Sequence, residues 1–169
     1  PIDSSPAVAN GLVYVGSEDK KLYAFDTSCR SGCQPLWSYT TGGGIEYTSP
    51  TVANGLVYIG SWDHKLYAFD ASCRSGCQPL WSYSTGNKIW SSPAVANGLV
   101  YVGSWDGELY AFDASCRSGC QPLWSYSTGN KIWSSPAVAN GLVYVGSWDG
   151  ELYAFDASCR SGCQPLWSY

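Results

Sequence analysis

The chain consists almost entirely of one unit of about 43 residues that is repeated four times. The stretch Ser91–Tyr126 recurs without a single change at Ser134–Tyr169, and the two earlier copies differ from it by limited numbers of substitutions. The copies span residues 4–47, 48–90, 91–133 and 134–169. Self-similarity at a period of roughly 20–50 residues is the signature of solenoids, propellers and other repeat arrays. We therefore expect a single domain over residues 1–169, built as an array of four similar units.

Two tight turns divide each copy into short extended runs. In the third copy the turns are Asn97-Gly98, the strongest short-range hairpin signal, and Asp106-Gly107. The extended runs carry apolar or aromatic residues on both faces, so that each sheet must be covered on both sides by its neighbours. We predict an all-β fold, a β-propeller of four tandem four-stranded antiparallel blades. Two hairpins in every copy argue against a linear β-solenoid, which has parallel rungs.

The composition argues against two classes of function and indicates how the core is built. A net charge of −4, with only 13% charged residues, does not suit a binder of nucleic acid or of an anionic membrane, because both need a basic surface. No apolar run approaches the length of a membrane span. The 9 tryptophans and 13 tyrosines indicate large aromatic side chains packed between layers. Because the chain has no methionine, we expect it to be a processed product or an excerpt.

Eight cysteines form four Cys-x-x-x-Cys pairs, one in each repeat. A structural zinc ion needs four ligands, and pairs on different blades should lie far apart, so zinc sites and free thiols are the less favoured alternatives. We predict four local disulfides and an oxidising compartment, the extracellular space or the cell surface. The predicted pairs are Cys29 with Cys33, Cys73 with Cys77, Cys116 with Cys120, and Cys159 with Cys163.

The run NGLVYVGSWDGELYAFDA, with Ala111-x-Asp113, Gly119 and Trp124, resembles the pyrroloquinoline-quinone-type, or quinoprotein-like, β-propeller repeat family. The resemblance covers essentially the whole chain, although Gly119 and Trp124 lie further from Asp113 than in the family signature Ala-x-Asp-x-x-Thr-Gly-x-x-x-Trp. It implies that one tryptophan of each blade packs across the interface to the next blade, and that one aspartate orders the adjoining loop. By residue match these are Trp37, Trp81, Trp124 and Trp167, with Asp26, Asp70, Asp113 and Asp156.

The chain offers no obvious catalytic constellation. Enzymes of this family hold a quinone and a calcium ion on the propeller axis, next to a disulfide between adjacent cysteines, and no two cysteines are adjacent here. Near-identical copies give rings of one residue type, whereas catalysis needs unlike residues converging on one substrate. We therefore predict no catalytic residue, no metal site and no cofactor. The single histidine, His64, replaces a turn glycine and is interpreted as a tolerated variant.

A tryptophan–aspartate pair in the second turn of each later copy is the candidate ligand site. Exposed indole rings beside carboxylates are suited to carbohydrate, and a ring of aspartates is suited to calcium. Packing against the next blade and turn formation explain the same residues more simply, and both interpretations stay open. Tyr47, Trp90 and Trp133, just before the inner strands, are expected to be in the core. The candidate site residues are Trp62, Trp105 and Trp148, followed by Asp63, Asp106 and Asp149, with Asp19 at the aspartate position of the first copy.

A propeller must close, because open end blades would leave aromatic faces and strand edges in water. Each blade is complete within its own copy, so no strand links the two ends. Closure with more blades, supplied by a second chain or by more of this one, is the favoured route, and self-association of two chains would give an eight-bladed ring. A four-bladed monomer and an open polymer are the alternatives. The expected function is a secreted, non-catalytic scaffold for structure or protein interaction. A lectin-like propeller that binds carbohydrate or a protein, an extracellular filament subunit and a quinone-dependent dehydrogenase fragment are the competing hypotheses.

Overall fold

The computed structural model describes all residues 1–169 as sixteen β-strands in four sheets. The strands are β1 (Ala7–Ala9), β2 (Leu12–Gly16), β3 (Lys21–Asp26), β4 (Trp37–Thr40), β5 (Thr51–Ala53), β6 (Leu56–Gly60), β7 (Lys65–Asp70), β8 (Trp81–Ser84), β9 (Ala94–Ala96), β10 (Leu99–Gly103), β11 (Glu108–Asp113), β12 (Trp124–Ser127), β13 (Ala137–Ala139), β14 (Leu142–Gly146), β15 (Leu152–Asp156) and β16 (Trp167–Ser168). The structure has no helix of the length and apolar character needed to span a membrane.

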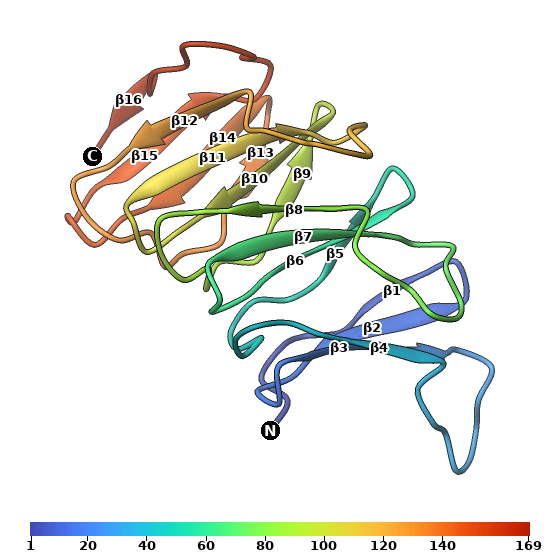
Figure 1. Ribbon diagram of the computed structural model, residues 1–169. Coiled ribbons are helices and arrows are strands. Elements are labelled where there is room, and N and C mark those ends of the chain that lie inside the picture. Colours follow the sequence, from blue (N-terminus) through green and yellow to red (C-terminus); the bar gives the residue numbers. More distant parts are fainter.

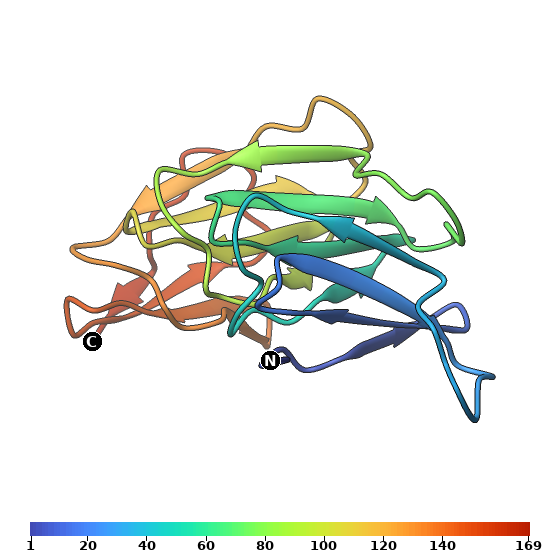
Figure 2. The ribbon, with the colours of Figure 1, turned by 60° about the horizontal axis from the view of Figure 1, so that its bottom comes forward.

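Each sheet is one blade and uses only strands of its own repeat, in the order β1-β2-β3-β4 and its three equivalents. All pairings between neighbouring strands are antiparallel. The blades lie side by side in chain order (Figure 1), and together they form an open arc with the first and last blades at opposite ends (Figure 2). The predicted all-β fold with four propeller blades is confirmed.

The hairpin between the first two strands of each blade follows from its turn sequence. Asn97 and Gly98 both have positive φ, 49° and 74°, as a two-residue hairpin turn of this type requires. The turn pairs Leu99 with Ala96, and this register places Val100 and Tyr101 on opposite faces of the blade. The same Asn-Gly turn, with positive φ at both residues, occurs in the other three blades.

The hydrophobic core lies between the blades, in three separate clusters of 12 buried residues. Each cluster takes one face from a blade and the opposite face from the next blade. In the first cluster, Tyr14 and Trp37 of the first blade pack against Ile59 and Phe69 of the second. The contact between consecutive blades is therefore the main stabilising element of the fold, because it buries most of the apolar surface.

Candidate functional site at the blade interfaces

The centre of the first interface is the indole ring of Trp37, which is only 5% exposed. Its ring centroid lies 5.7 Å from that of Phe69 on the next blade and 6.1 Å from that of Tyr14 on its own blade. Aromatic pairs at these separations contribute about 0.5–1.5 kcal/mol beyond the burial of their surface. The tryptophan thus joins the two apolar faces at the position that the family resemblance implies.

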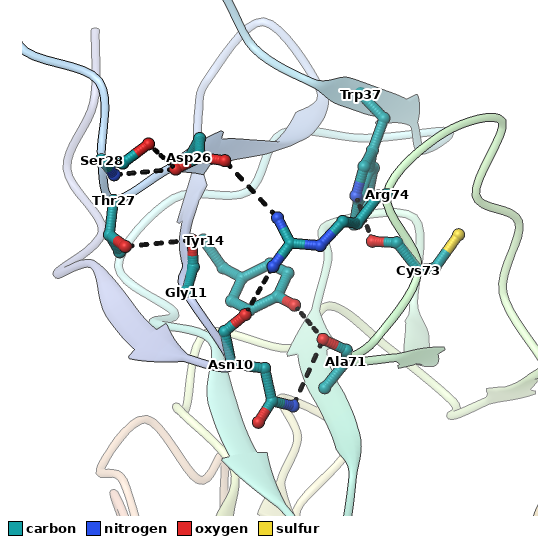
Figure 3. A network of polar contacts seen from close by, with 10 residues as sticks. All are labelled: Asn10, Gly11, Tyr14, Asp26, Thr27, Ser28, Trp37, Ala71, Cys73 and Arg74. Carbon is teal, nitrogen blue, oxygen red and sulfur yellow. Dashed lines mark hydrogen bonds and ion pairs between the residues drawn. The ribbon is translucent and has the colours of Figure 1, made fainter.

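Around this ring, polar atoms of the first blade donate to backbone carbonyl groups of the second (Figure 3). Trp37 Nε1 donates to the carbonyl oxygen of Cys73 at 3.0 Å, and the Tyr14 hydroxyl donates to that of Ala71 at 2.8 Å. Burial of the Tyr14 hydroxyl raises the pKa of this group. Both donors are removed from water and therefore need these acceptors, which fixes the position of the second blade relative to the first.

An arginine of the second blade completes the network in the opposite direction (Figure 3). Arg74 Nη2 donates to the carbonyl oxygen of Asn10 at 2.8 Å, and Nη1 lies 3.5 Å from Asp26 Oδ2. The hydroxyl and the backbone amide of Ser28 both donate to Asp26 Oδ1, and these bonds hold the pKa of the Asp26 carboxyl below its usual range. Asp26 therefore orders the loop after its strand and faces the next blade's arginine.

The hydrogen bonds between the blades recur at the second and third interfaces with nearly the same distances. Each tryptophan and tyrosine donates to the following blade, and each arginine donates back to the Asn-Gly turn of the preceding blade. The repeated bonds are Trp81 Nε1 to Cys116 O at 3.1 Å and Trp124 Nε1 to Cys159 O at 3.0 Å, Tyr58 to Ala114 O and Tyr101 to Ala157 O at 2.9 Å, and Arg117 to Asn54 O and Arg160 to Asn97 O at 2.9 Å. Trp167, the last of the four predicted docking residues, lies on the open face of the last blade.

The four predicted disulfides are formed, and they close the loops that supply the carbonyl groups and the arginines of the network. They join Cys29 to Cys33, Cys73 to Cys77, Cys116 to Cys120, and Cys159 to Cys163. The chain has no free cysteine. The disulfides therefore fix the same loop in every blade.

The second cysteine of each pair differs in burial between the first blade and the later ones. A loop cysteine is expected to lie at the surface, but Cys77, Cys120 and Cys163 are only 3–4% exposed. Each of them belongs to the apolar core shared with the preceding blade. Cys33 is exposed, because no other blade of the structure lies against this face of the first blade. In the later blades the disulfide thus also packs one sulfur atom in the interface.

An isoleucine in each linker between blades packs onto the glycine that ends the second strand of the preceding blade. A Cβ atom on Gly60 would lie 2.2 Å from Cγ2 of Ile89, so that only glycine fits there. The equivalent pairs are Gly16 with Ile45 and Gly103 with Ile132. Sequence reasoning missed these pairs, the arginines and the buried tyrosines. Their signal was the recurrence of the same residue at the same position in each copy.

The turn tryptophans form a row with the linker tryptophans. Trp62 stacks on Trp90 with 5.1 Å between ring centroids, and Lys88 Nζ lies 4.3 Å from the centre of the Trp62 ring. Trp105 and Trp133 continue the row at similar distances, and Lys131 Nζ covers the Trp105 ring at 4.3 Å. Trp90 and Trp133 are half-buried and lie outside the three core clusters, and Tyr47 is 54% exposed with its ring against Trp90. The expected core position of these three residues is therefore wrong.

The turn aspartates use both carboxylate oxygens in hydrogen bonds within the protein. Asp63 Oδ2 accepts from the amide of Gly42 in the linker and from the hydroxyl of Tyr67, each at 2.6 Å, and Oδ1 accepts from the amide of Lys65. Asp106 and Asp149 repeat this arrangement, whereas the Asp19 carboxylate accepts only from residues of its own blade. His64 is exposed at a φ of 71° in the same turn, where the later copies have glycine.

Several solved structures share this fold. The crystal structure of BamB from Moraxella catarrhalis matches 99% of the chain with a TM-score of 0.77 and 20% identity. The computationally designed Ika8 protein matches 97% with a TM-score of 0.76 and 19% identity, and quinohemoprotein alcohol dehydrogenase from Comamonas testosteroni matches 100% with a TM-score of 0.76 and 20% identity. The chain spans 49% of the BamB chain, 48% of Ika8 and 35% of the dehydrogenase. At these identities the likeness concerns the fold alone.

No curated protein sequence matches the chain. The family model described as outer membrane protein assembly factor BamB matches residues 1–75 and 74–168, which together cover nearly the whole chain. The matched segments contain all four repeats with their tryptophans and aspartates. The chain therefore belongs to the BamB-like family of quinoprotein-type propeller repeats.

Proposed function

We propose that the protein is a secreted, non-catalytic propeller scaffold whose two end faces dock further blades to complete a ring. The observation that carries this proposal is the repetition of one interface three times, with the same donors and acceptors. Because all internal interfaces are alike, a further blade of this type can dock on either open end face through the complementary half of the same interface. The chain is thus suited to assembly and to holding partners on a rigid frame.

The chemistry of the polar side chains supports a structural role. The interface tyrosines and the turn aspartates, which would be the candidate acids and bases, are committed to hydrogen bonds between and within blades. Four disulfides are typical of an extracellular or periplasmic protein, which supports an oxidising compartment outside the cytoplasm. Membership of a family described as an assembly factor agrees with a scaffold.

Quinone-dependent alcohol oxidation is the competing function, because a quinohemoprotein alcohol dehydrogenase shares the fold. The test is a titration of the protein with pyrroloquinoline quinone and calcium, followed by tryptophan fluorescence and by dye-linked oxidation of alcohols. A quinone-dependent dehydrogenase measured in the same buffer is the positive control. We expect neither saturable binding nor turnover. Saturable quinone binding together with alcohol oxidation would overturn the non-catalytic proposal.

Carbohydrate binding on the tryptophan row is a second candidate, favoured by one observation. The Trp148 ring is 55% exposed, with Lys131 Nζ 5.7 Å from its centre, whereas Lys88 and Lys131 lie only 4.3 Å from the centres of the Trp62 and Trp105 rings. An exposed indole face is suited to stacking against a sugar ring. A glycan array followed by fluorescence titration tests this function, with Trp148→Ala as the loss variant and Trp62→Ala as the matched control. Equal binding by both variants would exclude Trp148 as the site.

A further inference from the structure

The open face of the last blade is one half of the interface that the chain builds three times internally. Trp167 is 43% exposed, whereas its counterpart Trp81 is 5% exposed beneath the following blade. Leu152 is 40% exposed, whereas its counterpart Leu66 is fully buried. The indole nitrogen of Trp167 and the hydroxyl of Tyr144 correspond to the two interface donors of the other blades. The last blade therefore presents the donor half of the interface without its acceptor half.

The open face of the first blade is the acceptor half. Val13 and Phe25 are half-buried, whereas their counterparts Val57 and Phe69 in the second blade are fully buried under the preceding blade. The face keeps the apolar residues of the other blades, and the main change is Thr27 in place of an alanine. The first and last blades are therefore complementary to each other by the rules of the internal interfaces.

Arg30 donates hydrogen bonds to the two carbonyl groups of the first face that would accept from a docked blade. Its Nη1 donates to the carbonyl oxygen of Thr27 at 2.7 Å and to that of Cys29 at 3.2 Å. These carbonyls correspond to those of Ala71 and Cys73, which accept from the tyrosine and the tryptophan of the preceding blade. In the later blades the equivalent arginine extends to the preceding Asn-Gly turn instead. Arg30 thus satisfies its own blade's acceptors while no blade lies against them.

The first residues of the chain are placed as a linker from a preceding blade. The amide of Glu18 donates to the carbonyl oxygen of Pro1 at 3.1 Å, as the amide of Trp105 donates to that of Lys88 in the linker before the third blade. Ile2 then corresponds to the linker isoleucines that pack onto a glycine of the preceding blade. Its side chain is 59% exposed, whereas Ile89 is fully buried.

The glycine that would receive this isoleucine is also present and uncovered. Gly146 ends the second strand of the last blade, at the position of Gly60 in the second blade. The nearest atom to a Cβ built on Gly146 is Ser134 Oγ at 3.5 Å, whereas Gly60 is in close contact with Ile89. The chain thus carries both an exposed isoleucine at one end and an uncovered glycine position at the other.

We propose that a second copy of this chain docks its first blade on the last blade of the first copy, in the register of the internal interfaces, and that two such contacts close a ring of two chains. Ile2 of the second copy packs onto Gly146, and the Trp167 indole donates to the carbonyl oxygen of the second copy's Cys29. Arg30 leaves the two carbonyls and donates to Asn140 O, beside Asp156. This inference rests on the proposed docking role of the end faces and names their partner.

Two observations favour a second copy as the occupant. Each chain carries both halves of the interface, so one contact uses different surfaces on the two copies and leaves the other pair of surfaces to close the ring. The arc of the chain matches 49% of the BamB chain, so two arcs complete a fold of that extent.

The experiment measures mass by sedimentation velocity and light scattering under non-reducing conditions. Ile2→Asp places a carboxylate in the proposed contact, and Gly146→Trp fills the position that Ile2 would occupy. Each variant alone should raise the dissociation constant of the two-chain species at least about tenfold. Leu36→Asp is the matched control. Leu36 on the uncovered first blade and Leu123 on the third blade, which the second blade covers, are both 41% exposed. A blade docked in this register therefore does not cover the Leu36 side chain. This control should associate as the unchanged chain does.

Mixing the two variants distinguishes a head-to-tail contact from a symmetric one. The Ile2→Asp chain keeps an intact last blade, and the Gly146→Trp chain keeps an intact first blade, so the mixture should form a two-chain species through one good contact. A symmetric contact of like faces would give no such recovery. Far-UV circular dichroism and thermal unfolding check that both variants fold, as the exposed side chain of Ile2 and the uncrowded Cβ position of Gly146 lead us to expect.

Three outcomes would overturn the inference. These are the mass of one chain at all concentrations for the unchanged protein, a mass that grows without limit, and a two-chain mass that both variants retain. None of these three outcomes tests the non-catalytic proposal. That proposal is tested separately, by the quinone titration of the same sample. A single-chain mass without quinone binding would remove the second copy as partner and leave the non-catalytic role intact.

Discussion

Trp124 Nε1 lies 3.0 Å from the carbonyl oxygen of Cys159, a residue 35 positions later in the chain. This bond crosses from the third blade to the fourth and is the same as two others at the earlier interfaces. The chain also supplies its own control, because Trp167 holds the identical position on a blade that no other blade covers. The repeated interface can therefore be tested by pairs of identical substitutions in one protein.

Trp124→Phe should destabilise the protein by about 1–2 kcal/mol, because a buried carbonyl loses its donor and part of the aromatic contact is lost. Trp167→Phe should change the free energy of unfolding by less than about 0.5 kcal/mol in the single chain, because its indole nitrogen has no partner there. Urea unfolding at concentrations where the chain is monomeric measures both. Equal losses in the two variants would show that the interface bond contributes nothing.

Gly103→Ala should cost about 1–3 kcal/mol, because its Cβ would lie 2.1 Å from Cγ2 of Ile132 and the linker would have to move. Gly146→Ala is the matched control, since the nearest atom to its Cβ is Ser134 Oγ at 3.5 Å. We expect no loss of stability for this control, again in the single chain. A tolerated Gly103→Ala would contradict the close packing of linker on strand.

His64→Gly should stabilise the protein by about 0.5–1 kcal/mol, because His64 has a φ of 71°, a conformation that is costly for a residue with a Cβ atom. Gly107 and Gly150 occupy the same turn position in the later blades. Lys65→Gly, at the next residue in an ordinary strand, should instead destabilise by about 1 kcal/mol. Thermal unfolding compares the two variants, and a loss on both would exclude strain at His64.

Burial raises the pKa of Tyr58 and of Tyr101 to about 12. An unfolded tyrosine ionises near pH 10. Their contribution to stability is therefore complete below about pH 10 and is lost as the pH rises toward 12, because the unfolded chain releases the protons first. Absorbance titration near 295 nm should show several late-ionising tyrosines, and Tyr101→Phe should lower the amplitude of this late phase. This variant should also cost about 1 kcal/mol at neutral pH through the lost bond to Ala157. An unchanged late titration would contradict the assignment.

Replacing the pair Cys116 and Cys120 by serine should cost more than replacing Cys29 and Cys33. Both disulfides close rings of the same length, so the effect on the unfolded chain is the same, about 2 kcal/mol in the chain-entropy description. Cys120 is buried in the interface with the preceding blade, whereas Cys33 is exposed on the open first face. Equal losses in urea unfolding would show that packing of the sulfur atom adds nothing. Alkylation before reduction should label no thiol.

The local features of the fold could be predicted from the repeat itself. The Asn-Gly turns, the alternating strands and the short spacing of each cysteine pair depend on residues close in sequence, and the third blade has antiparallel strand pairs at both of the predicted turns. The functional assignment of the turn residues was less determined, because a tryptophan beside an aspartate suits either a ligand or a turn. The structure shows these contacts: the linker amide of Gly42 donates to Asp63, and Lys88 lies over the Trp62 ring.

The burial of the disulfides also could not be predicted from the sequence of one repeat. The spacing of Cys159 and Cys163 is enough to predict their bond, because both residues lie in one short loop. It does not reveal that the Cys163 sulfur packs against the third blade, because that contact depends on how two blades are placed. Cys33 has the same neighbours in sequence and is nevertheless exposed.

The period, the turn residues and the cysteine spacing act over a few residues, and they are enough to specify an array of like blades with disulfide-closed loops. The atoms that join one blade to the next follow from the packing of the blades in space. Arg74 meets Asn10 across 64 positions and Trp37 meets Cys73 across 36, and such contacts depend on the angle between neighbouring blades. The same angle leaves Ile2 and Gly146 uncovered at opposite ends of the arc, which no pattern within one repeat can specify.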